Sequence, residues 1–237
     1  MNVLLVHAHY EPQSFNAALK DLAVKTLSEA GHTVQVSDLY AMQWNPVASQ
    51  TDFGARSKPD YCVYALEQRH GAQNGTIASD IQSEIAKVEW SDLLILNFPI
   101  FWFSTPAILK GWIDRVFVSG LFYGGKRFYD QGGMRGKRVL VTFTIGGQPH
   151  MFGPEAIHGE IELMLRPLLR GTLAYAGFDV LPPFAAYHVP YISHEARCAI
   201  LDDYRDYLGR LDTLEPLSFP RMSDFDERLH PLPCSVL

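Results

Sequence analysis

The chain has 237 residues, of which 47% are hydrophobic and 19% are charged, as in an ordinary globular protein. Its formal net charge of −6 argues against a nucleic-acid binder, because neutralising a phosphate backbone takes clustered lysine and arginine. Its longest apolar run, residues 93–103, is too short to cross a bilayer, so we expect no stable membrane insertion.

The three cysteines, Cys62, Cys198 and Cys234, are widely separated and show no paired spacing. This spacing predicts reduced thiols rather than a disulfide framework or a cysteine-based metal site. The N-terminus also lacks the basic segment and cleavage site of a secretory signal. We therefore expect a cytoplasmic protein.

Strands and helices alternate through the first part of the chain. Residues 3–6 predict a short apolar strand, and Ser14 predicts the cap of a helix that ends at Gly31. A second strand is expected at residues 33–36, followed by a long connection over residues 41–75 with little periodicity. Isoleucine and valine residues then mark one face of a helix over residues 77–88.

The most informative stretch follows a strand over residues 93–98 that is apolar on both faces. Pro99 precedes three rings, Phe101, Trp102 and Phe103, and Pro106 suits the first turn of a helix that runs to residue 118. Clustered rings usually belong to a core. Three consecutive rings after a proline cannot all face one core, so at least one should line a cleft or an interface.

The second half continues the alternation. We expect a glycine-rich excursion over residues 119–136, a strand at 138–144, a helix near 161–169 kinked by Pro167, a fifth strand at 178–181 and a last helix at 196–211. This order predicts an α/β fold of flavodoxin-like size: a doubly wound sheet of about five parallel strands with helices on both faces. Residues 1–211 would form this domain, with a tail over residues 212–237 packing on the domain or a dimer partner.

Three loops leave the carboxyl ends of strands, where ligands of open α/β sheets bind. The first lacks the Rossmann glycine fingerprint, which argues against a nicotinamide dinucleotide held in the usual way. Its Ser14, with the amides of Phe15 and Asn16, could hold phosphate, although an ordinary helix cap has the same signature. With the aromatic loop and the turn at residues 145–149, the three loops suit a flavin, which needs a stacking surface and N–H donors.

The chain resembles the NAD(P)H:quinone reductase family of DT-diaphorase type. The resemblance is carried, in order, by Ala8-His9 with Ser14-Phe15-Asn16, residues 37–42, Phe98-Pro99 with Trp102-Phe103, residues 106–112, Thr144 with Gly146-Gly147, residues 157–159, and Gly177-Phe178.

This resemblance implies a homodimeric enzyme with active sites at the subunit interface. It implies that FAD takes hydride from NADH or NADPH and passes two electrons to quinones or related planar electrophiles in a ping-pong cycle. The implied cofactor contacts are His9, Ser14, Phe15, Asn16, Pro99, Ile100, Phe101, Trp102, Phe103, Thr144, Ile145, Gly146, Gly147 and Arg197. The implied catalytic residues are Trp102, Phe152 and His158, with Tyr123 and Tyr175 reaching the substrate from the second subunit.

The chain departs from the family pattern at several positions. Phe152 stands where the family has a tyrosine that donates a hydrogen bond, which makes His158 the main candidate for stabilising reduced flavin. Gly125 stands where an aromatic ring is common, which predicts a wider acceptor pocket. Arg170 and Ala174 stand at the positions of two zinc-binding histidines of some relatives, so no metal is expected.

Two other functions remain open at this point. An FMN-dependent azo- or nitroreductase would have the same fold and pocket, although Arg197 and the connection over residues 41–75 favour FAD. A one-electron carrier, or a flavin-binding regulatory subunit of a membrane transporter, belongs to a different class. Steady turnover of NAD(P)H with a quinone distinguishes the enzyme from a carrier, and co-purification with a membrane partner would favour the regulatory subunit.

Overall fold

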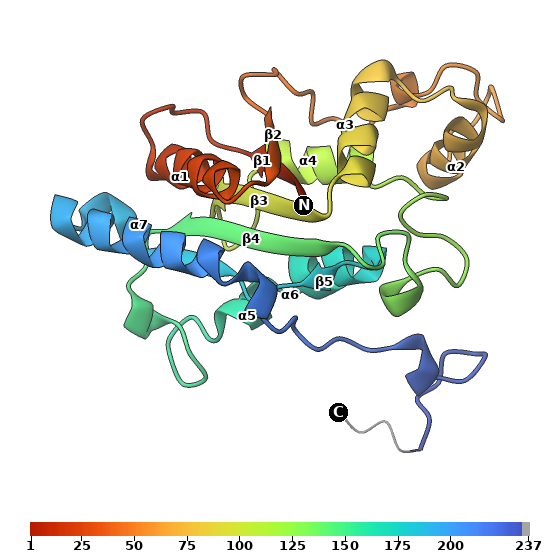
Figure 1. Ribbon diagram of the computed structural model, residues 1–237. Coiled ribbons are helices and arrows are strands. Elements are labelled where there is room, and N and C mark those ends of the chain that lie inside the picture. The colour runs from red at the N-terminus through yellow and green to blue at the C-terminus, as the bar shows by residue number, and fades with distance from the viewer. Residues whose placement is uncertain (234–237) are drawn as a thin grey trace.

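Residues 1–233, described by a computed structural model, form a six-stranded sheet with helices on both of its faces (Figure 1). The strands are β1 (Asn2–His7), β2 (Thr33–Asp38), β3 (Leu93–Pro99), β4 (Arg138–Ile145), β5 (Asp179–Val180) and β6 (Phe184–Tyr187). The α-helices are α1 (Phe15–Glu29), α2 (Tyr64–Asn74), α3 (Ser79–Trp90), α4 (Ala107–Val116), α5 (Ile161–Met164), α6 (Arg166–Leu168) and α7 (His194–Gly209). Short helical segments are η1 (Gln50–Asp52), η2 (Tyr129–Gln131), η3 (Pro149–Met151), η4 (Leu169–Ala174), η5 (Val189–Tyr191), η6 (Leu211–Thr213) and η7 (Met222–Asp224).

All strand pairs are parallel, and the order is β2-β1-β3-β4-β5, with β6 also paired to β4. This is the flavodoxin-like order, so the predicted fold class is confirmed. The chain reverses its direction across the sheet between β1 and β3. Loops that follow these two strands therefore separate at the carboxyl edge and leave room for a ligand.

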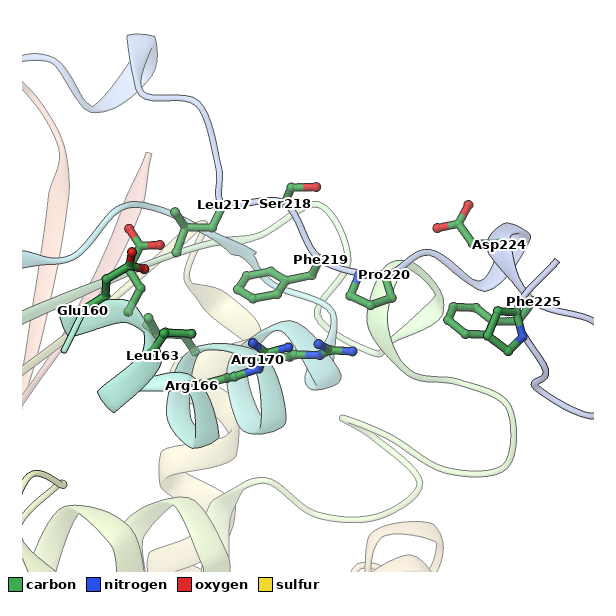
Figure 2. A pocket seen from close by; sticks show the side chains of 13 residues that line it. Glu160, Leu163, Arg166, Arg170, Leu217, Ser218, Phe219, Pro220, Asp224 and Phe225 are labelled. Atoms are coloured by element: carbon green, nitrogen blue, oxygen red, sulfur yellow. The ribbon is translucent and has the colours of Figure 1, made fainter. Parts of the chain in front are cut away.

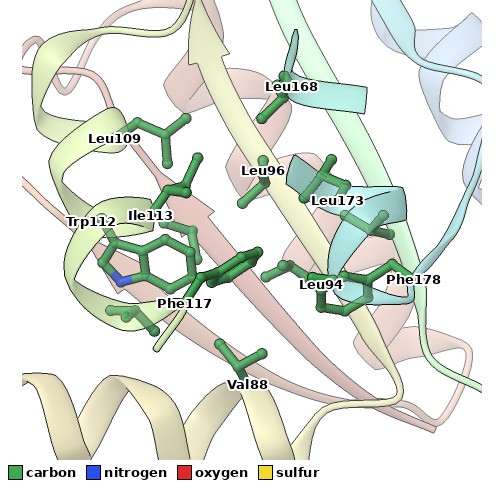
Figure 3. Packing of buried hydrophobic residues seen from close by; sticks show 14 of the residues in the cluster. Val88, Leu94, Leu96, Leu109, Trp112, Ile113, Phe117, Leu168, Leu173 and Phe178 are labelled. Atoms are coloured by element: carbon green, nitrogen blue, oxygen red, sulfur yellow. The ribbon is translucent and has the colours of Figure 1, made fainter. Parts of the chain in front are cut away.

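Burial of both sheet faces explains the continuous apolar strands. Every residue of β3 is buried, because α1 and α7 cover one face of the sheet while α3 and α4 cover the other. Figure 3 shows the second face, where Trp112 and Phe117 pack over Leu94 and Leu96 of β3. The rings of Trp112 and Phe117 meet edge to face with centroids 5.8 Å apart, a preferred geometry for aromatic pairs.

The connection expected over residues 41–75 is not one long loop, because this segment contains η1 and the whole of α2. The residues that α2 buries are Glu67, Gln68 and Gly71, so the helix has no apolar stripe. Its buried contacts are polar: the Glu67 carboxylate accepts hydrogen bonds from the N–H and hydroxyl of Ser57. Hydrophobic periodicity could not reveal such a helix.

A buried guanidinium holds this connection to the domain. Arg115 of α4 pairs with Asp52 of η1 and with Asp80 of α3, each at 2.9 Å. It also donates to the carbonyl oxygen of Asn45, and its guanidinium lies 4.7 Å from the centre of the Trp44 ring. One cation thus joins α4 to α3 and to the part of the connection over residues 44–52.

Three further differences concern the C-terminal half. The fifth strand is reduced to Asp179–Val180. The strand β6, which was not predicted, pairs with the carboxyl-terminal half of β4. The helix expected over residues 161–169 is divided into α5 and α6, followed by the π-helical η4. The last helix begins at His194, because the Ser193 hydroxyl caps it by accepting a hydrogen bond from the N–H of Ala196.

The tail leaves the end of α7 (blue in Figure 1) and contacts the domain. Leu217 N–H donates to the carbonyl oxygen of Val180, and Met222 N–H donates to the carboxylate of Asp130. The end of the tail, including Cys234, lies outside the described residues, and the division at residue 211 stays a prediction. Within residues 1–233, we find no helix that is long and apolar enough to cross a membrane.

Asp52→Asn should lower the free energy of unfolding at neutral pH by about 3 kcal/mol, because it removes one partner of a buried ion pair. Burial raises the pKa of the Asp52 carboxyl, but hydrogen bonds from Arg115, Tyr64 and Ser49 outweigh burial and hold this pKa below its ordinary value of 3.8. The stabilisation that ionised Asp52 gives the folded state is therefore fully present above pH 3.8, and it is lost as the pH falls through the lowered pKa. Urea unfolding of both proteins should show a difference that shrinks on acidification.

Asp21→Asn is the matched control, because the Asp21 carboxylate is exposed and pairs only at the surface with Lys20. It should change the free energy of unfolding by less than about 0.5 kcal/mol. An Asp52 effect as small as this, or one that persists undiminished in acid, would contradict the assigned role.

Candidate functional site

A cleft of about 680 Å³ opens at the carboxyl edge of the sheet, between the first turns of α1 and α7. It receives residues from the loops after β1, β3 and β4, as the three-loop prediction requires, and from the segment after β6. Its lining consists of His9, Gln13, Ser14, Phe15, Asn16, Ala18, Pro99, Ile100, Phe101, Thr144, Ile145, Gly146, Val189, Pro190, His194, Arg197, Cys198 and Leu201.

The first turn of α1 supplies hydrogen-bond donors to this cleft. The Ser14 hydroxyl caps the helix by accepting a hydrogen bond from the N–H of Ala17 at 3.1 Å. The N–H groups of Phe15 and Asn16, the first two of the helix, have no acceptor within it. The Asn16 side chain is almost fully buried, and its Nδ2 has no hydrogen-bond partner among the described residues. An anionic group in the cleft would satisfy these donors.

Two side chains from strand ends support the floor of the cleft. Thr144 Oγ1 donates to Asn16 Oδ1 at 2.7 Å, which orients the Asn16 amide. Below them, His7 Nδ1 lies 2.8 Å from Asn97 Oδ1, and burial lowers the pKa of His7. The floor is therefore polar and is fixed by one hydrogen bond between β4 and α1 and another between β1 and β3.

His9 is also at the cleft, as predicted. Its Nδ1 accepts a hydrogen bond from the N–H of Glu11 at 3.0 Å, and burial lowers the pKa of the ring. A neutral ring that accepts at Nδ1 carries its proton on Nε2. His9 can thus act at the cleft as a neutral donor.

The aromatic loop after β3 makes a tight turn. Phe101 and Ser104 exchange two backbone hydrogen bonds of 3.0 Å, and the residues between them, Trp102 and Phe103, both have positive φ, 50° and 56°. Such a turn normally takes Asn-Gly, because a side chain with Cβ is strained there by about 1 kcal/mol or more. The turn holds Trp102 away from the core, and this residue is 96% exposed. The prediction that the rings would not all enter the core is confirmed.

A second cavity of about 230 Å³ adjoins the cleft, and the two share Ile100 and Ile145. Three of the predicted catalytic residues, Trp102, Phe152 and His158, line it together with Phe103 and Gly147. The His158 ring lies with its centroid 5.1 Å from that of Phe103 and 5.2 Å from that of Phe152. The structure thus brings the three residues of the implied catalytic set into one pocket.

Phe152 is fixed from two sides. A Cβ added at Gly147 would lie 2.8 Å from the Phe152 ring, so only glycine allows this approach. The Tyr187 ring of β6 packs on the other side with centroids 5.5 Å apart.

Tyr123 and Tyr175 lie apart from this pocket within the single chain. Their ring centroids are 5.8 Å apart, and Phe128 stacks on Tyr175 at 5.4 Å. Neither tyrosine lines the cleft or the smaller cavity. Their predicted approach to a partner's active site therefore stays a prediction.

Arg197 lines the cleft on its α7 side, as expected, and donates from Nε to the carbonyl oxygen of Val189. His194 and Cys198 lie beside it, with Cys198 Sγ 3.6 Å from His194 Nε2. The sequence-based prediction missed His194 because it placed the start of α7 at residue 196, and it did not assign Cys198, one residue beyond Arg197, to the site. The cap Ser193 was the signal that could have located His194.

Residues 1–233 contain no group of three or more His, Cys, Asp and Glu side chains able to hold a metal ion. Arg170, at one of the positions where some relatives have histidine, instead lies beside Arg166 at a third cavity of about 670 Å³ (Figure 2). The tail closes this cavity with Leu217, Phe219 and Phe225. It shares no lining residue with the cleft.

Comparison with known proteins identifies the family. A family described as "Flavodoxin-like fold" matches residues 1–208. The mouse (Mus musculus) protein named ribosyldihydronicotinamide dehydrogenase [quinone] is 42% identical over 216 residues, which cover 91% of this chain and 94% of the relative. The chain belongs to the NAD(P)H:quinone reductase family. The predicted family is thereby confirmed, and the protein is an enzyme.

Two further members of this family show how far the likeness extends. NAD(P)H dehydrogenase [quinone] 1 of Cavia porcellus is 39% identical, with 94% of this chain and 82% of the relative covered. The crystal structure of a candidate quinone reductase from Klebsiella pneumoniae superimposes with a TM-score of 0.94 at 38% identity, covering 98% of this chain and 94% of that one. The likeness therefore includes most of each chain.

A flavin fits the residues present. The unpartnered Asn16 Nδ2 and the N–H groups at the start of α1 suit a phosphate, and the strand ends Pro99 and Thr144 border a space of suitable size. A Cβ built on Gly146 would touch nothing within 4 Å, so the turn leaves open space beside its backbone. These features match a phosphate beside the first turn of α1 and a flat ring beside the ends of β3 and β4.

Thr144→Val should lower the free energy of unfolding by about 2 kcal/mol, because it leaves the buried Asn16 oxygen without its donor while keeping the side-chain shape. Thr144→Ser keeps the donor and should lose less than about 1 kcal/mol. Chemical unfolding of the ligand-free proteins measures both changes. Equal losses in the two variants would show that the hydrogen bond to Asn16 is not what Thr144 contributes.

Proposed function

We propose that this protein is a flavin-dependent NAD(P)H:quinone oxidoreductase. Quinone reductase relatives that match over most of the chain support quinone reduction. The dependence on a flavin and NAD(P)H rests on the way two cavities meet. A cleft with phosphate-binding features joins an aromatic pocket at Ile100 and Ile145. Such a junction suits a flavin whose ring ends at the aromatic pocket.

FAD is the proposed cofactor. The cleft runs from the first turn of α1 to Arg197 and His194 of α7, beyond what one phosphate and a ring system require. Arg197 lies on the α7 side of the cleft and suits the adenosine half of a dinucleotide. A site for FMN alone would leave the part of the cleft beside α7 unused.

The small volume of the aromatic pocket supports a ping-pong cycle. Sites for drug-sized ligands usually have about 300 to 1,000 Å³, whereas this pocket has about 230 Å³. One planar ring fills such a space. Donor and acceptor would therefore occupy it in turn rather than together.

The residues of the pocket have separate roles in this proposal. When bound, flavin would accept hydride from the nicotinamide and return two electrons to the quinone. Trp102 and Phe103 would provide the ring surface on which planar substrates stack, and they would exclude water. His158 would donate a hydrogen bond to the flavin oxygen that gains negative charge on reduction. Phe152 has no donor and would shape the pocket only.

A homodimer in the cytoplasm is part of the proposal. A tryptophan that is 96% exposed is uncommon on a monomer surface, and it supports cover by a second subunit. The half-buried cluster of Tyr123, Phe128 and Tyr175 would supply that cover, since its rings pack on one another outside both cavities. The solution mass of the purified protein tests this assembly.

The deciding experiment identifies the flavin and follows its reduction. Heat-released cofactor should chromatograph as FAD, and its absorbance should bleach on anaerobic addition of NADH, NADPH or dihydronicotinamide riboside, the donor class that the mouse relative's name suggests. A quinone should then restore the absorbance. Released FMN would favour the azo- or nitroreductase alternative, and a flavin that none of the donors reduces would favour a regulatory subunit.

Phe152→Tyr should raise the rate constant of flavin reduction by about 10-fold, within the roughly 3 kcal/mol that one hydrogen-bond donor to a developing anion can contribute. The new hydroxyl would extend from Cζ, the ring atom near Gly147 at the edge of the pocket. His158→Ala should slow the same step. Anaerobic stopped-flow measurement separates this step from reoxidation, and unchanged reduction in both variants would refute these roles.

A further inference from the structure

His188 lies one residue beyond β6, in a backbone conformation that few side chains adopt. Its φ is 56°, in the left-handed region. Asparagine, aspartate and histidine occupy this region more often than other non-glycine residues. A non-glycine residue held there indicates that the surrounding structure determines its geometry.

Two hydrogen bonds connect His188 to the loop after β4. Its N–H donates to the carbonyl oxygen of Ile145 at 2.7 Å, which extends the pairing of β6 with β4 by one residue. Its Nδ1 lies 2.8 Å from the carbonyl oxygen of Gly146. Because a carbonyl oxygen only accepts, Nδ1 carries the proton in this contact. The Tyr191 ring packs on the imidazole with centroids 4.9 Å apart.

Little else holds Gly146 in place. A Cβ built there would meet no atom within 4 Å, so packing does not fix this residue. Two consecutive glycines are also the most flexible dipeptide. Gly146 borders the large cleft and Gly147 borders the aromatic pocket, and their N–H groups have no acceptor among residues 1–233.

We propose that His188 is a positioning residue whose imidazole holds the Gly146 carbonyl and thereby fixes the direction of the Gly147 N–H where the two cavities meet. Its backbone N–H holds the Ile145 carbonyl, which shares a peptide unit with the Gly146 N–H. The peptide unit is planar, so a clamp on the Gly146 carbonyl also sets the orientation of the Gly147 N–H. His188 lines neither cavity and acts through this peptide. The kinetic consequence of the clamp rests on the function proposed above, whereas the clamp itself does not.

Three substitutions separate the hydrogen bond from the backbone conformation. His188→Asn keeps both, because asparagine adopts positive φ and its Nδ2 occupies the place of the imidazole Nδ1. His188→Gly keeps the conformation and loses the donor. His188→Ala loses both. His150→Ala, a change at an exposed histidine outside both cavities, is the control.

In the flavin-loaded enzyme, His188→Gly should reduce flavin about 10-fold more slowly, since misplacement of reacting groups by 1 Å can cost about 100-fold. It should also shift the visible circular dichroism of the flavin, which a purely structural role would not. His188→Asn and His150→Ala should stay within about 2-fold of the wild type. A His188→Gly enzyme with unchanged rate and spectrum would overturn the proposal.

Backbone ¹⁵N relaxation of Gly147 in the flavin-free protein tests the clamp without any catalysis, because the clamped carbonyl lies in the same peptide unit as the Gly147 N–H. The order parameter of this N–H should stay near the value of about 0.85 typical of rigid backbone in His188→Asn and should fall below about 0.6 in His188→Gly. Equal order parameters would overturn the clamp even in an active enzyme. A lowered order parameter in a protein that binds no flavin would support the clamp and refute the proposed function.

Discussion

The parallel pairing of β4 with β3 on one side and β6 on the other determines where the site lies. Pro99 stands opposite Thr144, and Ile145 stands opposite Tyr187, so three strands end at the same height. The residues that follow them enter the same space. A slip of one residue in either pairing would turn the side chains of a whole strand to the opposite face.

Polar groups buried on both faces of the sheet extend this order to the loops. Under the cleft, Thr144 near the end of β4 donates a hydrogen bond to Asn16 at the start of α1. Beside it, His7 at the end of β1 pairs with Asn97 of β3. On the other face, Arg115 holds the connection that contains η1 and α2. Such groups are costly to bury without partners and therefore select one arrangement of the chain. These buried polar contacts therefore hold the site in one geometry.

The elements that an apolar pattern marks could be predicted from the sequence. The elements and residues that depend on polar contacts or on strand register could not. β3 and β4 were recognisable because both of their faces are buried, and the loops after them could be assigned to a ligand site. β6 was missed because Phe-Ala-Ala-Tyr is short and follows two prolines. The role of His188 depends on a hydrogen bond to a backbone carbonyl, which no residue type at Gly146 reveals.

The turn at Trp102 and Phe103 has a consequence for how this chain can change. Asn-Gly would relax both positive φ angles and make the folded state more stable, but it would erase the exposed rings. Selection for heat resistance alone would favour that replacement, whereas selection for turnover would remove it. The same two positions thus record which of these pressures has governed the protein.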